Sequence, residues 1–124
     1  GKSIQNTLSG IDIQPGEFIL LKTRNSYETE FRPDFIYLRK DGAEYLAQRG
    51  IKGVGIDALG VERGQPGHET HLSLMKKDVL ILEGLALRDV AGGPYFMIAL
   101  PMKIRDAEGA PARVLLLDDL SVLN

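Results

Sequence analysis

Residues 51–57 read IKGVGID, a short apolar stretch that predicts a β-strand buried on both faces. Two similar runs, Phe18–Leu21 (FILL) and Val79–Leu82 (VLIL), are apolar throughout and predict two more buried strands. The glycines within residues 51–57 indicate that the backbone packs closely against the preceding helix. We therefore expect Val54–Ile56 and Val79–Leu82 to be neighbouring strands in the interior of one sheet.

Two segments have helical signals. Asp41 and Glu44, three residues apart, form a plausible capping pair at the start of a helix, and Gly50 is well placed to end that helix. Residues 69–76 predict a second, shorter helix. Together with the apolar runs, these segments alternate strand and helix along the chain.

The last third of the chain predicts a hairpin. Tyr95–Leu100 and Arg113–Leu117 are strand-like, and the polar turn of residues 106–109 (DAEG) lies between them. Short strands with two helices predict an α/β fold of mixed α+β type. The length of 124 residues fits a single domain spanning residues 1–124.

Composition excludes several classes of function. The net charge of −2, from 15 basic and 17 acidic residues, argues against a general nucleic-acid binder. The absence of cysteine excludes disulfides, thiolate zinc sites and cysteine nucleophiles. No apolar stretch approaches the ~18 residues of a membrane span, and no signal-peptide pattern opens the chain. These features predict a cytoplasmic protein that does not interact with a membrane.

The two histidines of the chain, His68 and His71, are three residues apart. Neutral imidazole is a common metal ligand and can act as a base near neutral pH. A spacing of three brings both rings toward one side of a helical turn. The HETH pattern differs from the zincin motif, whose histidines are four apart. Two surface histidines near a helix start are therefore the alternative interpretation.

Two carboxylates follow buried strands directly. Glu83 comes after the run that ends at Leu82, and Asp57 comes after Ile56. Because ligand sites of open α/β sheets lie at the carboxyl ends of strands, both are candidate site residues. The alternatives are a solvated Glu83 or one paired with Arg88, and an Asp57 that forms an Asx turn or a cap.

These segments resemble the cyclase family of metal-dependent hydrolases, which includes the kynurenine formamidases. Glu83-Gly84, twelve positions after His71, belongs to the resemblance, which covers most of residues 17–117 in the family's order. The other matching stretches are DFIYL at 34–38, AEYLA at 43–47, VGID at 54–57, IALPMKI at 98–104 and APARV at 110–114.

The resemblance implies a swivelling β/β/α-like fold, usually dimeric, that holds one or two zinc or manganese ions. His71 corresponds to a late histidine that acts as metal ligand or base, and Glu83 to a late glutamate ligand. His68 has no firm counterpart and is carried as an additional candidate. Asp57 matches an aspartate near the site with a structural or substrate-orienting role. Gly60 departs from the pattern, in which a serine is common.

The resemblance covers only the C-terminal portion of a family member. The family's histidine-rich motif, H-x-G-T-H-x-D-x-P-x-H, has no counterpart here, so we expect a fold incomplete at its N-terminus. The chain is then a truncation, a piece of a split protein or a diverged short homologue. It would form a homo-oligomer or bind a complementing N-terminal portion.

The leading functional hypothesis is metal-dependent hydrolysis of a carbon–nitrogen amide bond in a small molecule, an arylformamide or a cyclic amide. The divalent metal would be incompletely held, or absent, in this chain alone, and the isolated chain would then be inactive. The alternative is a non-catalytic fragment, a binding or oligomerisation domain that keeps the fold. The number of ligands discriminates between them, because a catalytic zinc typically has three protein ligands and a water.

Overall fold

The computed structural model of the chain describes residues 11–30 and 34–119. It has two compact units, one ending at Asp89 and the other beginning at Val90. The first unit contains a parallel sheet with both α-helices, and the second contains a two-stranded ribbon. The predicted mixture of helix and strand is confirmed, whereas the single domain spanning residues 1–124 stays a prediction.

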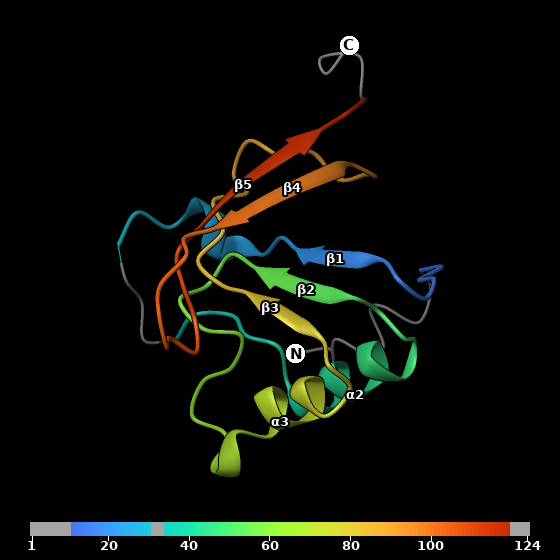
Figure 1. Ribbon diagram of the computed structural model, residues 1–124, viewed down its shortest axis with the longest axis vertical. Helices are drawn as coiled ribbons and strands as arrows, with labels where there is room; N and C mark the ends of the chain where they lie inside the picture. The colour runs from blue at the N-terminus through green and yellow to red at the C-terminus, as the bar shows by residue number, and fades with distance from the viewer. Residues whose placement is uncertain (1–10, 31–33, 120–124) are drawn as a thin grey trace. The chain divides into compact units, whose positions relative to one another are not determined.

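The sheet of the first unit has three parallel strands in the order β1-β2-β3 (Figure 1). The strands are β1 (Phe18–Leu21), β2 (Gly53–Ile56) and β3 (Leu80–Leu82). All three apolar runs therefore form strands, and β2 and β3 are neighbours as predicted. Every residue of β2 is buried, as expected for a central strand.

The prediction that β3 is an interior strand is wrong. Within the described residues β3 pairs only with β2, and Leu80 is 57% exposed. An apolar run indicates that the side chains of a strand pack against other apolar groups. It does not specify whether the strand has a hydrogen-bonded neighbour on one side or on both. Val79, just before the strand, is the buried residue of this run.

The glycines of β2 allow close contact with the flanking strand and loop. A Cβ atom on Gly53 would lie 2.2 Å from the ring of Phe18, on β1. One on Gly55 would lie 2.7 Å from Leu85 and 2.8 Å from Leu20. The expected packing of these glycines against the preceding helix is therefore wrong, because the nearest side chains belong to β1 and to the segment after β3.

Two helices, α2 (Lys40–Gln48) and α3 (Glu69–Met75), pack against each other in the first unit (Figure 1). Gly50 follows α2 with a φ of 72°, so it ends the helix in the left-handed conformation, as predicted. The expected capping pair is wrong, because the N-cap residue is Arg39, which makes no side-chain cap, and Asp41 already lies in the first turn of the helix.

One hydrophobic core joins the helices to the sheet. Most of its fully buried side chains come from the segment before α2, from both helices and from β2, and two more, Ile13 and Val61, come from the segments before β1 and after β2. They include Leu38, Leu46, Val54, Ile56 and Leu74. Two 3-10 helices, η1 (Arg24–Tyr27) and η2 (Pro66–His68), lie in the connections around this core.

The second unit is an antiparallel ribbon of β4 (Phe96–Pro101) and β5 (Ala112–Leu117). It agrees with the predicted hairpin to within one residue at each strand start. Several of its large apolar side chains are exposed, among them Leu100 at 58% and Met102 at 60%. Neither α2 nor α3 has the length and hydropathy of a membrane-spanning segment, as judged over residues 11–30 and 34–119.

Candidate metal centre

The carboxylate of Asp57 follows β2 and is nearly buried, with the residue 7% exposed. It accepts hydrogen bonds from the backbone N–H of Thr23 at 2.7 Å and from the Thr23 hydroxyl at 2.8 Å. The hydroxyl of Ser26 donates a third. These three residues, which we call the Asp57 cluster, tie the start of η1 to the end of β2. The hydrogen bonds favour a structural role for Asp57.

A second carboxylate, that of Glu62, lies in the loop between β2 and η2, and its side chain is only 5% exposed. Its Oε1 accepts hydrogen bonds from the backbone N–H of His71 at 3.0 Å and from the His71 ring through Nδ1. Its Oε2 accepts from the Gln65 side chain at 2.8 Å and from the backbone N–H of Thr70 at 3.3 Å. We call these four residues the Glu62 cluster.

The hydrogen bonds of the Glu62 cluster control the charge of its carboxyl group. Burial by itself would raise the pKa of Glu62, because it disfavours the charged form. The hydrogen bonds from His71, Gln65 and Thr70 outweigh burial and lower the pKa of Glu62 from 4.5 to about 2. Glu62 is therefore a carboxylate throughout the neutral range, with a negative charge beside an imidazole ring.

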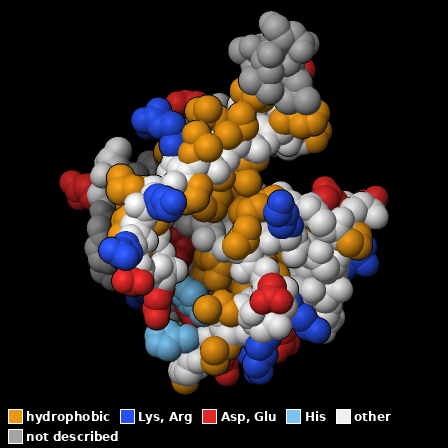
Figure 2. All heavy atoms as spheres, viewed as in Figure 1, with side chains coloured by type: hydrophobic (Ala, Val, Ile, Leu, Met, Phe, Trp, Pro, Cys, Tyr) orange, Lys and Arg blue, Asp and Glu red, His pale blue; other side chains and the backbone are white. Residues whose placement is uncertain are grey.

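His68 and His71 come together, but not on one turn of a helix. His71 is in the first turn of α3, whereas His68 precedes that helix in a left-handed conformation with φ 52° and ψ 49°. The two ring centroids are 6.4 Å apart, in an edge-to-face arrangement. The histidines are the pale blue side chains on the face shown in Figure 2. His68 is exposed, and the His71 side chain is 33% exposed.

Among the described residues, Glu62, His68 and His71 form a group that could hold a metal ion. One potential ligand atom from each lies within 4.8 Å of the other two. Imidazole nitrogen and carboxylate oxygen are both zinc ligands, so the donor types fit a divalent metal. The ring of His71 uses Nδ1 for Glu62, and its Nε2 has no hydrogen-bond partner in the described part of the chain.

Glu83 is not a member of this group. Its Oε2 accepts a hydrogen bond at 2.7 Å from the backbone N–H of Val61, the residue before Glu62. A Cβ atom on Gly60 would lie 3.3 Å from the same oxygen, so a glycine there eases the approach of Glu83 to the loop. Glu83 therefore contacts the segment that carries Glu62. Shared metal binding by His71 and Glu83 stays a prediction.

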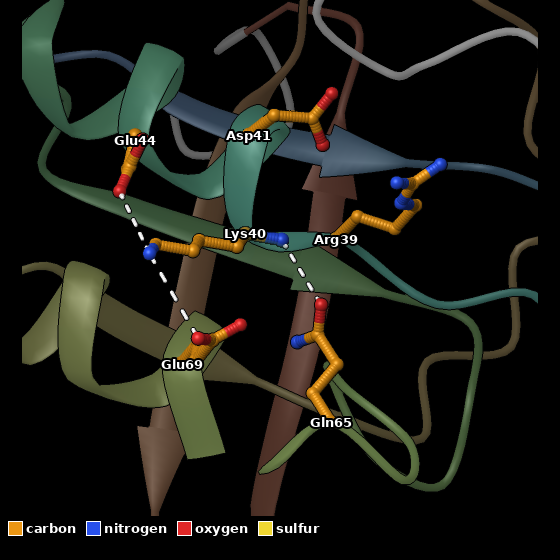
Figure 3. Close-up of a pocket in the computed structure, with 6 residues that line it drawn as sticks. All are labelled: Arg39, Lys40, Asp41, Glu44, Gln65 and Glu69. Carbon is orange, nitrogen blue, oxygen red and sulfur yellow. Dashed lines mark hydrogen bonds and ion pairs between the residues drawn. The ribbon is translucent and has the colours of Figure 1, made fainter. Parts of the chain in front are cut away.

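The Gln65 side chain connects the Glu62 cluster to an open hollow beside the first turns of α2 and α3 (Figure 3). Its Oε1 accepts a hydrogen bond from the backbone N–H of Lys40 at 3.2 Å. The Lys40 ammonium lies between Glu44, at 3.9 Å, and Glu69, at 3.8 Å. These ion pairs are exposed and contribute little to stability. The hollow is lined by Arg39, Lys40, Asp41, Glu44, Gln65 and Glu69.

Comparisons with known proteins identify the family. Residues 2–63 match the family model described as "Putative cyclase". The chain is 34% identical over 111 residues to a kynurenine formamidase of Bacillus cereus, an alignment that covers 88% of this chain and 53% of that protein. It is 35% identical over 106 residues to Cyclase-like protein 3 of Oryza sativa subsp. japonica, covering 80% of this chain and 39% of that protein.

Two solved structures are similar throughout most of the chain. One, described as a "Potential Metal-Dependent Hydrolase With Cyclase Activity", has a TM-score of 0.90 and 51% identity over 93% of this chain and 57% of that one. The other, a "predicted metal-dependent hydrolase from Bacillus stearothermophilus", has a TM-score of 0.88 and 52% identity over 90% and 55%. The chain belongs to the cyclase family, as the sequence resemblance indicated, and it spans about half the length of the curated relatives it matches.

Sequence reasoning missed Glu62. The residue is in a polar loop without helical or strand periodicity, nine positions before His71. This interval differs from the H-E-x-x-H pattern, in which the metal-binding histidines are four residues apart. Only the path of the loop, which returns to the first turn of α3, makes Glu62 a neighbour of the histidine.

Proposed function

We propose that the protein to which this chain contributes is a metal-dependent hydrolase of a carbon–nitrogen amide bond. The observation that carries the proposal is the His71 ring, which is hydrogen-bonded at Nδ1 to a buried carboxylate and lies beside a second histidine. The names of the kynurenine formamidase and metal-dependent hydrolase relatives support it. Within that reaction class, the proposed substrates are small arylformamides or cyclic amides.

The proposed metal ligands are His71 and Glu83, with His68 as an additional candidate. When bound, a divalent ion such as zinc or manganese supplies an electrophile that activates water and polarises the amide carbonyl. His71 contributes a neutral nitrogen, and Glu83 a negative charge. The bond from Val61 to Glu83 fixes one carboxylate oxygen and leaves lone pairs on the other for a ligand. Asp57 would keep the turn after β1 in place.

The two ligands that the family resemblance assigns, His71 and Glu83, do not complete a catalytic zinc site by themselves, and His68 has no counterpart in that resemblance. A catalytic zinc typically has three protein ligands and an open position for water. The histidine-rich motif that the family resemblance implies would supply the others. We therefore expect the isolated 124 residues to have little or no formamidase activity with either zinc or manganese.

A fusion protein tests the proposal directly. The N-terminal portion of the Bacillus cereus kynurenine formamidase would be placed ahead of this chain, and hydrolysis of N-formylkynurenine would be measured with zinc or manganese. We expect activity in the fusion and none in either piece. Full turnover by this chain alone would contradict the incomplete site. A folded, metal-loaded fusion without activity would favour the non-catalytic alternative.

We also propose that the chain associates, either as a homo-oligomer or with a complementing N-terminal portion. The support is the exposed apolar surface of the second unit, where Phe96, Leu100 and Leu115 on the ribbon and Met102 just after β4 are all more than two-fifths exposed. Exposed apolar patches of this kind commonly become interfaces. Light scattering at about 50 µM, where micromolar affinities are detected, is the test. A monodisperse monomer would contradict homo-oligomerisation.

A further inference from the structure

We propose that Glu62 is the positioning residue of His71. In this assignment its carboxylate holds the proton of the imidazole on Nδ1, so that Nε2 is the nitrogen available to a metal. The role of this arrangement in metal binding rests on the proposed function, whereas the contact between Glu62 and the ring of His71 does not. It concerns a residue that neither the sequence pattern nor the comparisons assign.

The acceptor capacity of the Glu62 carboxylate favours the positioning role. An ionised carboxylate has about four lone-pair positions. Glu62 accepts four hydrogen bonds, from the His71 amide, the His71 ring, the Gln65 side chain and the Thr70 amide. A metal bound directly to Glu62 would have to displace one of these donors. The carboxylate is therefore suited to holding the ring of His71 rather than to binding the ion.

The difference in burial between Glu62 and His71 also favours the positioning role. The Glu62 side chain is 5% exposed and that of His71 is 33% exposed, so the histidine is the more accessible member of the pair. An ion arriving from solvent meets the imidazole more readily than the carboxylate behind it. Metal-binding histidines commonly donate their other ring N–H to a carboxylate, which fixes the tautomer and the ring orientation.

The Glu62 carboxylate is itself held in place by neighbouring polar groups. Gln65 donates to Glu62 with its amide nitrogen, while its oxygen accepts from the Lys40 backbone. These two contacts determine which way the amide of Gln65 points. The same amide nitrogen donates to the Thr70 hydroxyl at 2.6 Å, and that hydroxyl donates to the carbonyl of Leu38 at 2.7 Å. Glu62 is thus held by Gln65 and by the start of α3, and Gln65 is itself held by the backbone of α2 and by Thr70.

A purely structural role is the rival explanation. The Thr70 and His71 amides lie in the first turn of α3, where backbone N–H groups lack helical partners, and His68 makes no side-chain cap. Glu62 could act only as a remote cap for that helix. A cap needs the two backbone hydrogen bonds, whereas positioning also needs the bond to the ring. The two roles therefore differ in what they predict for the tautomer of His71.

The test is the tautomer of His71, measured by long-range ¹⁵N–¹H correlation on the labelled 124-residue chain without metal. The measurement is made at about pH 9, well above the usual histidine pKa of about 6.5. We expect protonated Nδ1 and unprotonated Nε2 in the wild type. A proton predominantly on Nε2 of the wild-type ring would overturn the proposal without any variant.

The matched variants are Glu62→Gln and Glu69→Gln. A glutamine at 62 can accept from the ring only if its NH₂ faces the Gln65 and Thr70 donors, so we expect a mixture of tautomers. Glu69 is also in the first turn of α3 but is paired with Lys40, so its substitution should leave the tautomer unchanged. A folded Glu62→Gln chain with the wild-type tautomer would indicate that Glu62 acts only as a cap.

Titration with zinc chloride then separates this inference from the proposed function. We expect zinc to shift Nε2 of His71, with affinity 10- to 100-fold lower in Glu62→Gln, a range typical of residues that support a ligand. Glu69→Gln should change the affinity by no more than about twofold. Zinc on Nδ1, or on the Glu62 carboxylate, would overturn the positioning role. If zinc does not bind at all, the proposed metal site of this chain is contradicted, whereas the tautomer measurement still tests whether Glu62 orients His71.

Discussion

Asp57 and Glu62 lie five residues apart in the loop after β2, and each is a buried carboxylate that accepts several hydrogen bonds. They differ in the donors. Asp57 is bonded to an amide and two hydroxyls, groups that hold a turn in place and bind metals poorly. Glu62 is bonded to an imidazole. Burial of a carboxylate therefore does not by itself indicate a functional role. The chemistry of the group that donates a hydrogen bond to it is the better indicator.

The largest effect should come from His71→Ala in the fusion described above. Removing a metal ligand should lower kcat/KM by more than the 10- to 100-fold loss typical of a residue that only supports one. Glu69→Gln is the control, because Glu69 shares the helix but not the contact with Glu62. Steady-state hydrolysis of N-formylkynurenine is the measurement. Retained activity in His71→Ala would place the functional residue elsewhere.

Asp57→Ala should mainly change stability. It leaves the Thr23 amide and two hydroxyls without their acceptor, which should lower the free energy of unfolding by about 3–4 kcal/mol. Urea denaturation of the chain measures this loss. The exposed Asp89→Ala is the control and should change stability by less than about 0.5 kcal/mol.

The Asp57→Ala variant also tests the comparison of the two clusters. If the Asp57 cluster is only structural, the tautomer of His71 should be the same in this variant as in the wild type, provided that the chain remains folded. A changed tautomer would show that the two clusters are coupled.

Glu62 should make stability depend on pH in the acidic range. Its pKa is lowered from 4.5 to about 2 in the folded chain, so its contribution is complete above 4.5 and is lost as pH falls toward 2. At about 1.36 kcal/mol per pKa unit, the loss is at most about 3 kcal/mol. Urea denaturation at neutral pH and at about pH 2.5, for wild type and Glu62→Gln, measures it. An equal stability difference between the two proteins at both pH values would contradict the assignment.

The smallest effect on folding should come from Glu83→Gln. Glutamine keeps an oxygen that can accept from Val61, and the side chain is exposed, so the free energy of unfolding should fall by less than about 1 kcal/mol. The same substitution in the fusion should remove activity if Glu83 is a metal ligand. A stable and fully active Glu83→Gln fusion would assign Glu83 to the support of the loop alone.

Much of the fold could be predicted from local patterns. The run Phe18–Leu21 forms β1 with the predicted bounds, and Gly50 ends α2 because its positive φ suits glycine. The edge position of β3 could not be predicted. Strand order depends on which strands pair, and an apolar run such as Val79–Leu82 is compatible with either a central or an edge position.

The residues of the candidate site likewise fall into those that the sequence predicts and those that only the fold reveals. His71 and Glu83 are predicted site residues because histidine and carboxylate are recognisable ligand types and their interval resembles a family pattern. Glu62 was missed because its role depends on a loop that turns back through Gly67, at φ 70°, and His68, at φ 52°. Such loop paths leave no periodic signal in a sequence.

The sequence by itself determined the strands, the helix that ends at Gly50, the two histidines and the family of the chain. These follow from local apolar runs, from residue chemistry and from motifs at fixed spacing. Only the tertiary structure decided that Asp57 holds the turn after β1 and that Glu62 holds the ring of His71. The physical reason is that a buried carboxylate is satisfied by whichever donors the folded chain brings within hydrogen-bond distance, and those donors come from distant positions in the sequence.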